Sequence, residues 1–310
     1  MSAIIQPSNT SRLRLVKEVD TGWRDISGAA AWSPNQSQLA VAGHGAVWLY
    51  RTDQTDTPIR MLNGHKDDVA SIALSPNGKF LASGGADRNI LLWDIDTGFP
   101  LMTLTGHSDF ISSIAFSPDG IHLESAGRDE ATVRIWNYSL SRQESVLTHP
   151  DNESVLTVTY IDNGKAIASA GQNGVVYIWD AEKALLLTAL EAHHACIISL
   201  AFHPRENILA SADLDGKIIL WDVNTYKRRG LLHHNEGVRS VAFNSDGSIL
   251  STGGILDRTI NLWSVSTNLN VATLASTSSG ALNVTFNSDS TILASSNENG
   301  LVQLWMPQEP

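Results

Sequence analysis

The sequence predicts an all-β fold in which one antiparallel four-stranded unit is repeated seven times, and two observations support this prediction. A short apolar strand that ends in tryptophan recurs along the chain, and its tryptophans stand 43, 43, 42, 42 and 42 residues apart. Glycine-rich turns and turns of the Ser-Pro-Asp-Gly type recur between them, flanked by alternating β-branched residues, as in strands joined by tight turns. Four strands every 42 or 43 residues form one blade of a β-propeller, so we expect seven blades.

The repeated tryptophans fix the register of the copies. One period before the first of them stands Tyr50, in the stretch AVWLYR, and we take it as the equivalent residue of the first copy. Trp48 in the same stretch is rejected because we expect it on the opposite face of the strand. The tryptophans of the other copies are Trp93, Trp136, Trp179, Trp221, Trp263 and Trp305.

Each copy is predicted to hold its strands in the same order. VASIALSPNGKFLASGGAD (69–87) and ISSIAFSPDGIHLESAGRD (111–129) each give an apolar run, a turn, a second apolar run and a glycine-rich turn. The tryptophan strand follows, and after it comes a more variable fourth strand such as PLMTLTGH (100–107). The copies span about residues 22–62, 64–103, 106–146, 149–189, 192–231, 234–273 and 276–307.

The two ends of the chain are predicted to close the ring. The last copy stops after its third strand, whereas RLRLVKEVD (12–20) precedes the first copy without a sheet of its own. Pairing residues 11–19 into the last blade as its outer strand removes an exposed sheet edge. We therefore expect a single domain over residues 11–310, preceded by a flexible tail at 1–10 that is polar and contains a proline.

Composition limits the classes of function. The chain is 42% hydrophobic, and 32 acidic against 21 basic side chains give a formal charge of −11. This charge argues against non-specific binding to nucleic acid or to an anionic membrane. The N-terminal stretch lacks the pattern of a signal peptide, and no apolar run approaches the roughly 18 residues of a membrane helix. We expect a soluble, cytoplasmic and monomeric ring.

A Ser-His-Asp combination in the second copy raises the question of catalysis. His65, Ser83 and Asp87 are the residue types with which hydrolases activate an alcohol nucleophile. The combination returns in most other copies, complete or weakened, whereas an enzyme needs one preorganised triad beside an oxyanion hole. We therefore expect no catalytic residues and a structural role for the combination.

The repeated motifs resemble those of the WD40-repeat family. Gly-His precedes several copies, as at 64–65 and 106–107, and Trp-Asp ends several, as at 93–94 and 179–180. The resemblance covers residues 11–310 and implies a seven-bladed propeller in which an acid binds the histidine, the histidine binds the serine, and the serine binds the indole N–H. The residues that it places in these networks are His65, Ser83, Asp87, Trp93, His107, Ser125, Asp129, Trp136, His149, Ser169, Asn173, Trp179, His193, Ser211, Asp215, Trp221, His234, Thr252, Asp257 and Trp263.

Two pairs of adjacent histidines superficially resemble metal ligands. HHACII (193–198) places them beside Cys196, the single cysteine, and LHHNEG (232–237) places them beside Glu236. One histidine of each pair belongs to an implied network, and neither stretch has helical spacing or a second cysteine. No glycine-rich phosphate loop follows a strand and opens a helix. We expect no metal and no cofactor.

The resemblance also implies where partners bind. In propellers of this kind partners dock on the narrower top face, at positions three and five residues after the Gly-His histidine and immediately before the tight-turn acid. Here many of those positions hold apolar residues, with arginines among them, which is typical of a protein-binding hot spot. The alternative is that several of these side chains plug the channel mouth or pack on one another. The candidate partner-binding residues are Phe110, Arg128, Leu156, Ile198, Leu214, Arg239, Leu256 and Leu282.

The sequence thus predicts a non-catalytic scaffold that presents a rigid face to protein or peptide partners. Two alternatives stay open. One is a propeller that binds a small molecule or catalyses a reaction in its central channel, and the other is the sensor or regulatory ring of a larger kinase or NTPase assembly. The fold itself specifies neither the partner nor the process.

Overall fold

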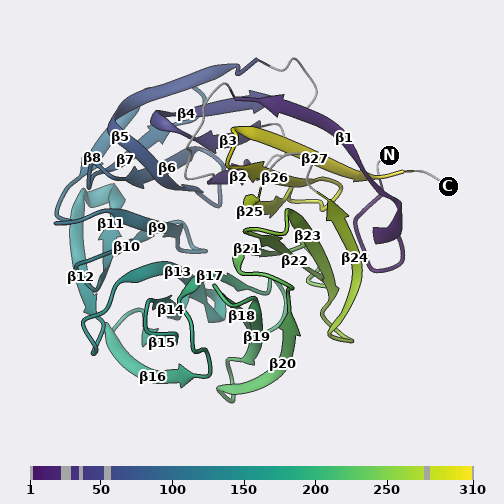
Figure 1. Cartoon of the computed structure of the whole chain (residues 1–310). Coiled ribbons are helices and arrows are strands. Elements are labelled where there is room, and N and C mark those ends of the chain that lie inside the picture. Colours follow the sequence, from purple (N-terminus) through teal and green to yellow (C-terminus); the bar gives the residue numbers. More distant parts are fainter. Residues whose placement is uncertain (1–2, 22–28, 35–37, 52–56, 276–279, 309–310) are drawn as a thin grey trace.

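The computed structural model shows antiparallel β-sheets arranged as a ring around a common centre (Figure 1). It describes residues 3–21, 29–34, 38–51, 57–275 and 280–308, so the repeat starts expected at 22 and 276 lie outside the described residues. The described part contains 27 strands and three short 3₁₀ helices, η1 (Thr10–Arg12), η2 (Tyr138–Leu140) and η3 (Asp162–Gly164). No helix within these ranges has the length and apolar character needed to cross a membrane.

Four of the predicted blades are separate sheets of four consecutive antiparallel strands, each with its first strand nearest the centre (Figure 1). Blade 3 holds β9 (Ile111–Phe116), β10 (His122–Gly127), β11 (Thr132–Asn137) and β12 (Arg142–Thr148). Blade 4 holds β13 (Val155–Ile161), β14 (Ala166–Gly171), β15 (Val175–Asp180) and β16 (Leu185–Glu191). Blade 5 holds β17 (Ile197–Phe202), β18 (Ile208–Asp213), β19 (Lys217–Asp222) and β20 (Lys227–His233). Blade 6 holds β21 (Val238–Phe243), β22 (Ile249–Gly254), β23 (Thr259–Ser264) and β24 (Leu269–Ala275).

Blades 1 and 2 share one continuous sheet because a single long strand serves both. The first part of β5 (Arg60–Leu74) pairs with β4 of blade 1, and its second part pairs with β6 of blade 2. Blade 1 also holds β2 (Ala30–Trp32), β3 (Gln38–Ala42) and β4 (His44–Arg51). Blade 2 also holds β6 (Phe80–Gly85), β7 (Ile90–Asp94) and β8 (Pro100–Leu104).

The N-terminal strand closes the ring, as predicted. β1 (Leu13–Asp20) pairs antiparallel with β27 (Leu301–Pro307), which places Val19 opposite Val302. Together with β25 (Ala281–Phe286) and β26 (Leu293–Asn297) these strands form blade 7. On the inner side β25 contacts β2 of blade 1, so the first and last blades are neighbours (Figure 1).

The hydrophobic core lies in the seams between neighbouring blades. Each seam has its own cluster of buried apolar side chains, in which the repeat tryptophan of one blade, or Tyr50 in blade 1, faces the preceding blade. At the seam between blades 1 and 2, Trp93 packs in one cluster with Ala40 and Leu49. Fully burying a large apolar side chain stabilises the fold by roughly 1.5–3 kcal/mol, so the seams bind the blades together.

The first copy is registered on Tyr50, but Trp48 lies elsewhere than expected. Tyr50 pairs with Leu39 in the same way that Trp93 pairs with Leu81, which confirms the register. Trp48 was expected on the opposite face, and this was wrong, because side chains two residues apart in a strand share a face. Both rings are buried in the seam between blades 7 and 1.

Residues 3–10 are packed against the ring, which corrects the expectation of a flexible tail. The Ile5 side chain is 0% exposed and belongs to the cluster between blades 6 and 7. Its N–H donates to the carbonyl of Ser290 (2.7 Å), and its carbonyl accepts from Asn244 Nδ2 (3.0 Å). Polar composition suggested disorder, but the buried Ile5 side chain and the two hydrogen bonds of its backbone, one to the Ser290 carbonyl and one from the Asn244 side chain, dock the segment.

Candidate functional site

The Ser-His-Asp combination of blade 2 forms a buried chain of hydrogen bonds that ends on tryptophan. Asp87 Oδ2 lies 2.9 Å from His65 Nδ1, and His65 Nε2 lies 2.7 Å from Ser83 Oγ. The Trp93 indole N–H donates to the same Ser83 Oγ (2.8 Å). Because Asp87 can only accept, Nδ1 carries the proton and the serine hydroxyl donates to Nε2. The chain therefore satisfies every polar atom around a buried tryptophan.

The electrostatics of this network fit a structural role. Burial raises the pKa of Asp87, but the hydrogen bonds from the backbone N–H groups of Lys66 and Asn89 and the interaction with the His65 imidazole outweigh it, so the pKa lies below its ordinary value. The Ser83 side chain is fully buried, and its oxygen and proton are already engaged by indole and imidazole. This serine is not presented to a substrate.

Blade 3 has the same network, but with Glu130 instead of the expected Asp129. His107 Nδ1 is bound to Glu130 Oε1, His107 Nε2 lies 2.6 Å from Ser125 Oγ, and the Trp136 indole donates to Ser125 Oγ (2.8 Å). The turn before the tryptophan strand is one residue longer than in blade 2, which moves Asp129 out of reach. Asp129 is exposed and instead accepts from the Ser154 hydroxyl (2.8 Å).

The carboxylate of Glu130 is strongly stabilised by its partners. Burial raises its pKa, but the backbone and side-chain hydrogen bonds from Ser108 and the proximity of His107 outweigh this, so the pKa falls from 4.5 to about 2. A negatively charged Glu130 also holds the His107 tautomer that accepts from Ser125.

In blade 5 the acid is Asp213, so the expected Asp215 was also wrong. Asp213 Oδ2 lies 2.7 Å from His193 Nδ1, and His193 Nε2 lies 2.7 Å from Ser211 Oγ, which accepts from the Trp221 indole (2.9 Å). Asp213 is the last residue of β18 and is buried, whereas Asp215 is exposed in the following turn. The acid of blade 5 thus comes from the end of the strand rather than from the turn.

In blade 4 the expected acid equivalent does not bind the histidine. Asn173 was expected to bind His149, but it binds Asp151 and the Tyr177 hydroxyl (3.1 Å). His149 still lies 2.7 Å from Ser169 Oγ, and the Trp179 indole donates to that oxygen (2.8 Å).

The imidazole of blade 6 is turned over. His234 uses Nδ1 toward Thr252 Oγ1 (2.9 Å) and Nε2 toward Asp257 (3.0 Å), and the Trp263 indole donates to Thr252 Oγ1 (3.0 Å). In the last blade the Trp305 indole donates to Ser295 Oγ at a longer distance, 3.3 Å.

Seven of the eight candidate partner-binding residues line one cavity of about 580 Å³ at the centre of the ring; they are Phe110, Arg128, Leu156, Ile198, Leu214, Arg239 and Leu282. Four of the apolar ones are half-buried, in line with the alternative that side chains fill the channel mouth, whereas Leu214 is 42% exposed. Leu256 does not line the cavity. At 73% exposure it is the most exposed large apolar side chain among the described residues.

The charged part of the cavity wall is cationic. Arg128 and Arg239 are the charged residues among the described side chains that line it. The Arg128 guanidinium lies over the Phe110 ring, with Cζ 5.9 Å from the ring centroid. Arg239 is exposed, but partial loss of hydration at the cavity wall and the nearby charge of Arg128 lower its pKa, while Glu298 acts in the opposite direction.

A ring of hydroxyl groups along the channel was missed by the sequence reasoning. In each case a hydroxyl oxygen on one inner strand accepts the backbone N–H of the next blade, and the pairs are Ser71 with Ile114 (2.9 Å), Ser113 with Val158 (3.2 Å), Thr157 with Leu200 (3.2 Å), Ser199 with Val241 (3.1 Å) and Ser240 with Val284 (3.1 Å). The signal was a serine or threonine at one position of the inner strands of blades 2 to 6, two residues after Val69, Ile111, Val155, Ile197 and Val238. Blade 7 has Asn283 there, and its buried Oδ1 has no hydrogen-bond partner among the described residues.

A buried glutamate was also missed. Glu124 on β10 is fully buried, and neither carboxyl oxygen has a hydrogen-bond partner among the described residues. It shares a face with Ala126, which packs in the seam between blades 3 and 4. Burial raises the pKa of Glu124 well above its ordinary value. The sequence signal was a glutamate at a position that holds a small residue in every other blade. The equivalent residues are Ala40, Ala82, Ala168, Ala210, Ser251 and Ala294.

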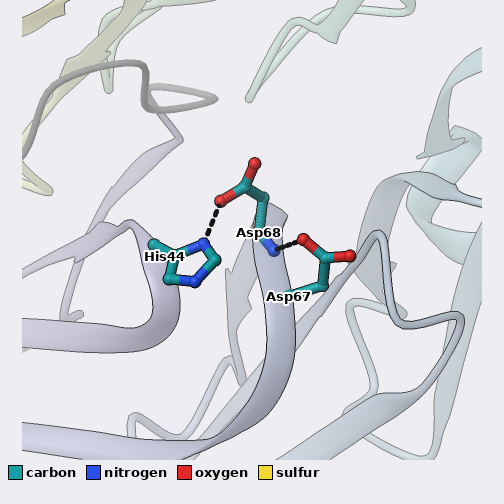
Figure 2. A group of neighbouring side chains, drawn as sticks. All are labelled: His44, Asp67 and Asp68. Atoms are coloured by element: carbon teal, nitrogen blue, oxygen red, sulfur yellow. Dashed lines mark hydrogen bonds and ion pairs between the residues drawn. The ribbon is translucent and has the colours of Figure 1, made fainter.

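One exposed group brings three potential metal ligands together, although not the ones that the sequence suggested. Figure 2 shows His44, Asp67 and Asp68, whose ligand atoms all lie within 4.8 Å of one another. His44 Nδ1 lies 2.7 Å from Asp68 Oδ1, and the Asp68 N–H donates to Asp67 Oδ1 (2.9 Å). An exposed ion pair and a local hydrogen bond account for this grouping without a metal. Over the described part of the chain, the histidine pairs at 193–194 and 233–234 join no such group.

A ring of seven blades, hydrogen-bond networks that anchor a tryptophan in most of them, and an apolar and cationic channel mouth define a β-propeller of the repeat-protein class. The family model described as WD domain, G-beta repeat (WD40) matches residues 56–94, 98–137, 141–180, 184–222 and 226–264. These matches cover more than half of the chain, so the chain belongs to the WD40 family. Members of this family generally bind other proteins.

Part of the chain is similar to longer curated proteins. It is 28% identical over 138 residues to Periodic tryptophan protein 2 from Arabidopsis thaliana, which covers 43% of this chain and 15% of that protein. It is 30% identical over 139 residues to Anaphase-promoting complex subunit cdh1 from Dictyostelium discoideum, covering 43% and 18% respectively. It is 28% identical over 145 residues to Cilia- and flagella-associated protein 337 B from Tetrahymena thermophila, covering 42% and 11%. The matched part spans less than a fifth of each relative.

Proposed function

We propose that the chain is a non-catalytic, cytoplasmic scaffold whose channel mouth binds a protein or peptide partner. The observation that supports this most is the gathering of apolar side chains from several blades around one cavity, with Leu214 exposed in its wall and Leu256 exposed in the equivalent turn of the next blade. Large exposed apolar side chains beside arginine are typical of interaction hot spots. Because strands and tight turns hold these residues, little ordering cost accompanies binding.

The networks support a scaffold rather than an enzyme. The serines that could act as nucleophiles, such as Ser83, Ser125 and Ser211, are fully buried and bound to both a tryptophan and a histidine. Their role in this proposal is to hold the seams rigid.

A small molecule in the channel is the second candidate, and the cavity volume favours it. About 580 Å³ lies within the range of small-molecule sites, roughly 300–1,000 Å³. The hydroxyl oxygens of the wall, however, already accept backbone N–H groups, which reduces the polar contacts available to a small ligand. We therefore rank it below a protein partner.

Membership of a larger assembly, including one driven by a kinase or NTPase, is compatible with the scaffold proposal. One relative carries the name of a subunit of the anaphase-promoting complex, and the printed names of the others specify no enzyme. Such an assembly would supply the partner that the mouth binds.

Affinity capture from a lysate of the source cells tests the proposal. We would compare the parent with the rim variant Leu214→Asp/Leu256→Asp and with the control Leu140→Asp/Leu269→Asp. Leu140 in η2 and Leu269 at the start of β24 are 58% and 63% exposed and lie at the opposite end of the blades. All three proteins must first unfold at the same temperature. We expect the rim variant to lose a partner that the parent and the control retain. Equal capture by the rim variant would contradict the proposal.

A further inference from the structure

The charge of the channel mouth narrows the chemistry of the partner. The chain carries a formal charge of −11, yet the described charged side chains that line the cavity are both arginines. Arg128 follows β10 in blade 3, and Arg239 lies on β21 in blade 6. Positive charge thus stands beside apolar side chains in the wall of this cavity, although the chain as a whole is acidic.

Both guanidinium groups lack an ion-pair partner among the described residues. The Arg128 guanidinium lies over the Phe110 ring. Arg239 is close enough to Arg128 for the repulsion between the two positive charges to lower its pKa. Glu298 attracts Arg239 from outside the cavity lining, but it forms no described ion pair with it. Both side chains are exposed to solvent but line the same cavity, so their like charges destabilise each other, and a bound anion would relieve that cost.

The surroundings of the arginine pair discriminate between anions. Ile198, Leu214 and Leu282 also line the cavity, so a ligand that fits must place apolar surface beside its negative charge. A nucleic acid backbone carries dense negative charge and would be repelled by the rest of this acidic protein. A carboxylate-bearing peptide with a neighbouring apolar side chain meets both requirements, and arginine binds carboxylates in a bidentate manner.

We infer that the channel mouth binds an acidic peptide segment of a partner protein, whose carboxylates pair with Arg128 and Arg239 and whose adjacent apolar side chain packs against Ile198 and Leu214. This inference rests on the proposed function, since it assigns the partner's chemistry at the same face. The Phe110 ring already orients the Arg128 guanidinium, so this side chain loses little freedom on binding.

Fluorescence anisotropy with the full chain and a panel of labelled ten-residue peptides tests the inference. Each peptide carries one Leu, Phe, Ile or Met flanked by two Asp or Glu on either side, and each has a matched form with Asn or Gln in place of the acids. We expect at least one acidic peptide to bind about tenfold or more tightly than its amide form, and to bind less tightly as salt rises.

Two matched double variants locate the charge effect. Arg128→Gln/Arg239→Gln should weaken binding of the acidic peptide by about tenfold or more. Lys227→Gln/Arg228→Gln removes the same charge from the exposed outer strand β20 and should leave binding within about twofold of the parent. Equal losses in both variants would overturn the inference, because they would reflect net charge and not the arginine pair.

Other outcomes also decide the matter. Acidic and amide peptides that bind equally, or a panel in which nothing binds, would overturn the inference. Displacement of the peptide by a single-stranded ten-nucleotide DNA at lower concentration than unlabelled peptide would assign the arginines to nucleic acid and overturn it as well. If no peptide of the panel binds while Leu214→Asp/Leu256→Asp still loses a captured partner, the acidic-peptide inference is wrong and the proposed scaffold function stands. If that variant keeps every partner, the proposed function itself falls.

Discussion

The acid is the most variable residue of the tryptophan networks. It is Asp87 in the tight turn of blade 2, Glu130 in a longer turn of blade 3, and Asp213 at the end of a strand in blade 5. Any carboxylate that reaches Nδ1 of the histidine satisfies the same chemistry, so its position along the chain is free within a few residues. Serine, histidine and tryptophan are constrained more tightly because each must contact a buried partner.

Exchanging the two acids of blade 3 for amides tests the corrected assignment. Glu130→Gln should lower the free energy of unfolding by about 2 kcal/mol at pH 7, because a charged hydrogen bond to His107 is lost. Asp129→Asn, a neighbouring exposed residue with one hydrogen bond to Ser154, should change it by about 0.5 kcal/mol or less. Urea unfolding of the two variants measures both values. A larger loss of unfolding free energy in Asp129→Asn than in Glu130→Gln would favour Asp129, the residue predicted from the sequence, as the acid of this network.

The same pair of variants predicts a pH dependence. The folded-state pKa of Glu130 is lowered from 4.5 to about 2, so its stabilising contribution is complete above pH 4.5 and is lost as the pH falls toward 2. The difference in unfolding free energy between the parent and Glu130→Gln should therefore shrink from pH 5 downward. A difference that is constant over this range would contradict the assignment.

Glu124 is expected to weaken the seam that contains it. Glu124→Met, which keeps the length of the side chain, should raise the free energy of unfolding by about 1–3 kcal/mol at pH 7, since it removes two unpartnered buried oxygens. The folded pKa is raised above 4.5, so the parent loses stability as the pH rises from 4.5 through the folded pKa. The advantage of the variant should grow over the same window. Glu182→Met, on an exposed turn, is the control, and an advantage independent of pH would refute the explanation.

The inner strands are joined by the hydroxyl ring as well as by the apolar seams. Ser240→Ala would leave the Val284 N–H without its acceptor and should cost about 1–3 kcal/mol in thermal or urea unfolding. Ser240→Thr, which keeps the hydroxyl, should recover most of this loss, and Ser139→Ala at an exposed position of η2 should cost almost nothing. If Ser240→Ala and Ser139→Ala behave alike, the ring contributes no stability.

The strands could be predicted wherever they follow the repeated sequence pattern. Turns and tryptophan strands recur at one period, so seven blades and the closure by residues 11–19 could be predicted before any coordinates. Features that depart from the repeated pattern could not be predicted. The longer turn of blade 3 displaced Asp129, Asp213 acts from a position where blade 2 has Gly85, and the docking of Ile5 depends on contacts far along the chain.

The candidate site was predictable in part for the same reason. Positions carried over from related propellers placed seven of eight residues around the channel, because the blade geometry fixes where those positions lie. How far each side chain is buried was not predictable, since it depends on neighbours from other blades. Phe110 and Leu156 are half-buried and line the channel, whereas Leu256 is exposed and lies outside it.

At the scale of the whole molecule, one strand holds the two ends of the ring together. Val19→Asp would place a carboxylate in the apolar seam between blades 7 and 1 and should lower the free energy of unfolding by about 3 kcal/mol or more. Val16→Asp makes the same change three residues earlier in β1, at an exposed position that is skipped by the pairing with β27, and should cost less than about 1 kcal/mol. Equal effects would show that the closure contributes little.

The ring and its cavity lined by apolar side chains and two arginines lead to the central claim, that partners bind at the channel mouth. The only cysteine of the chain, Cys196, lines the cavity there, so a photo-crosslinker attached to its thiol reports on the mouth alone. Burial raises the pKa of this thiol, and labelling is therefore carried out at elevated pH. The matched control is Cys196→Ser/Leu140→Cys, which moves the label from the start of blade 5 to η2 of blade 3, at the opposite end of the blades.

The most direct measurement is photo-crosslinking of a captured partner from these two labelled positions, followed by mass spectrometry of the joined peptides. The account predicts that the label on Cys196 joins the partner and that the label on the Leu140→Cys control does not. A partner that crosslinks from the control position and not from Cys196 would contradict the claim that the channel mouth is the binding face.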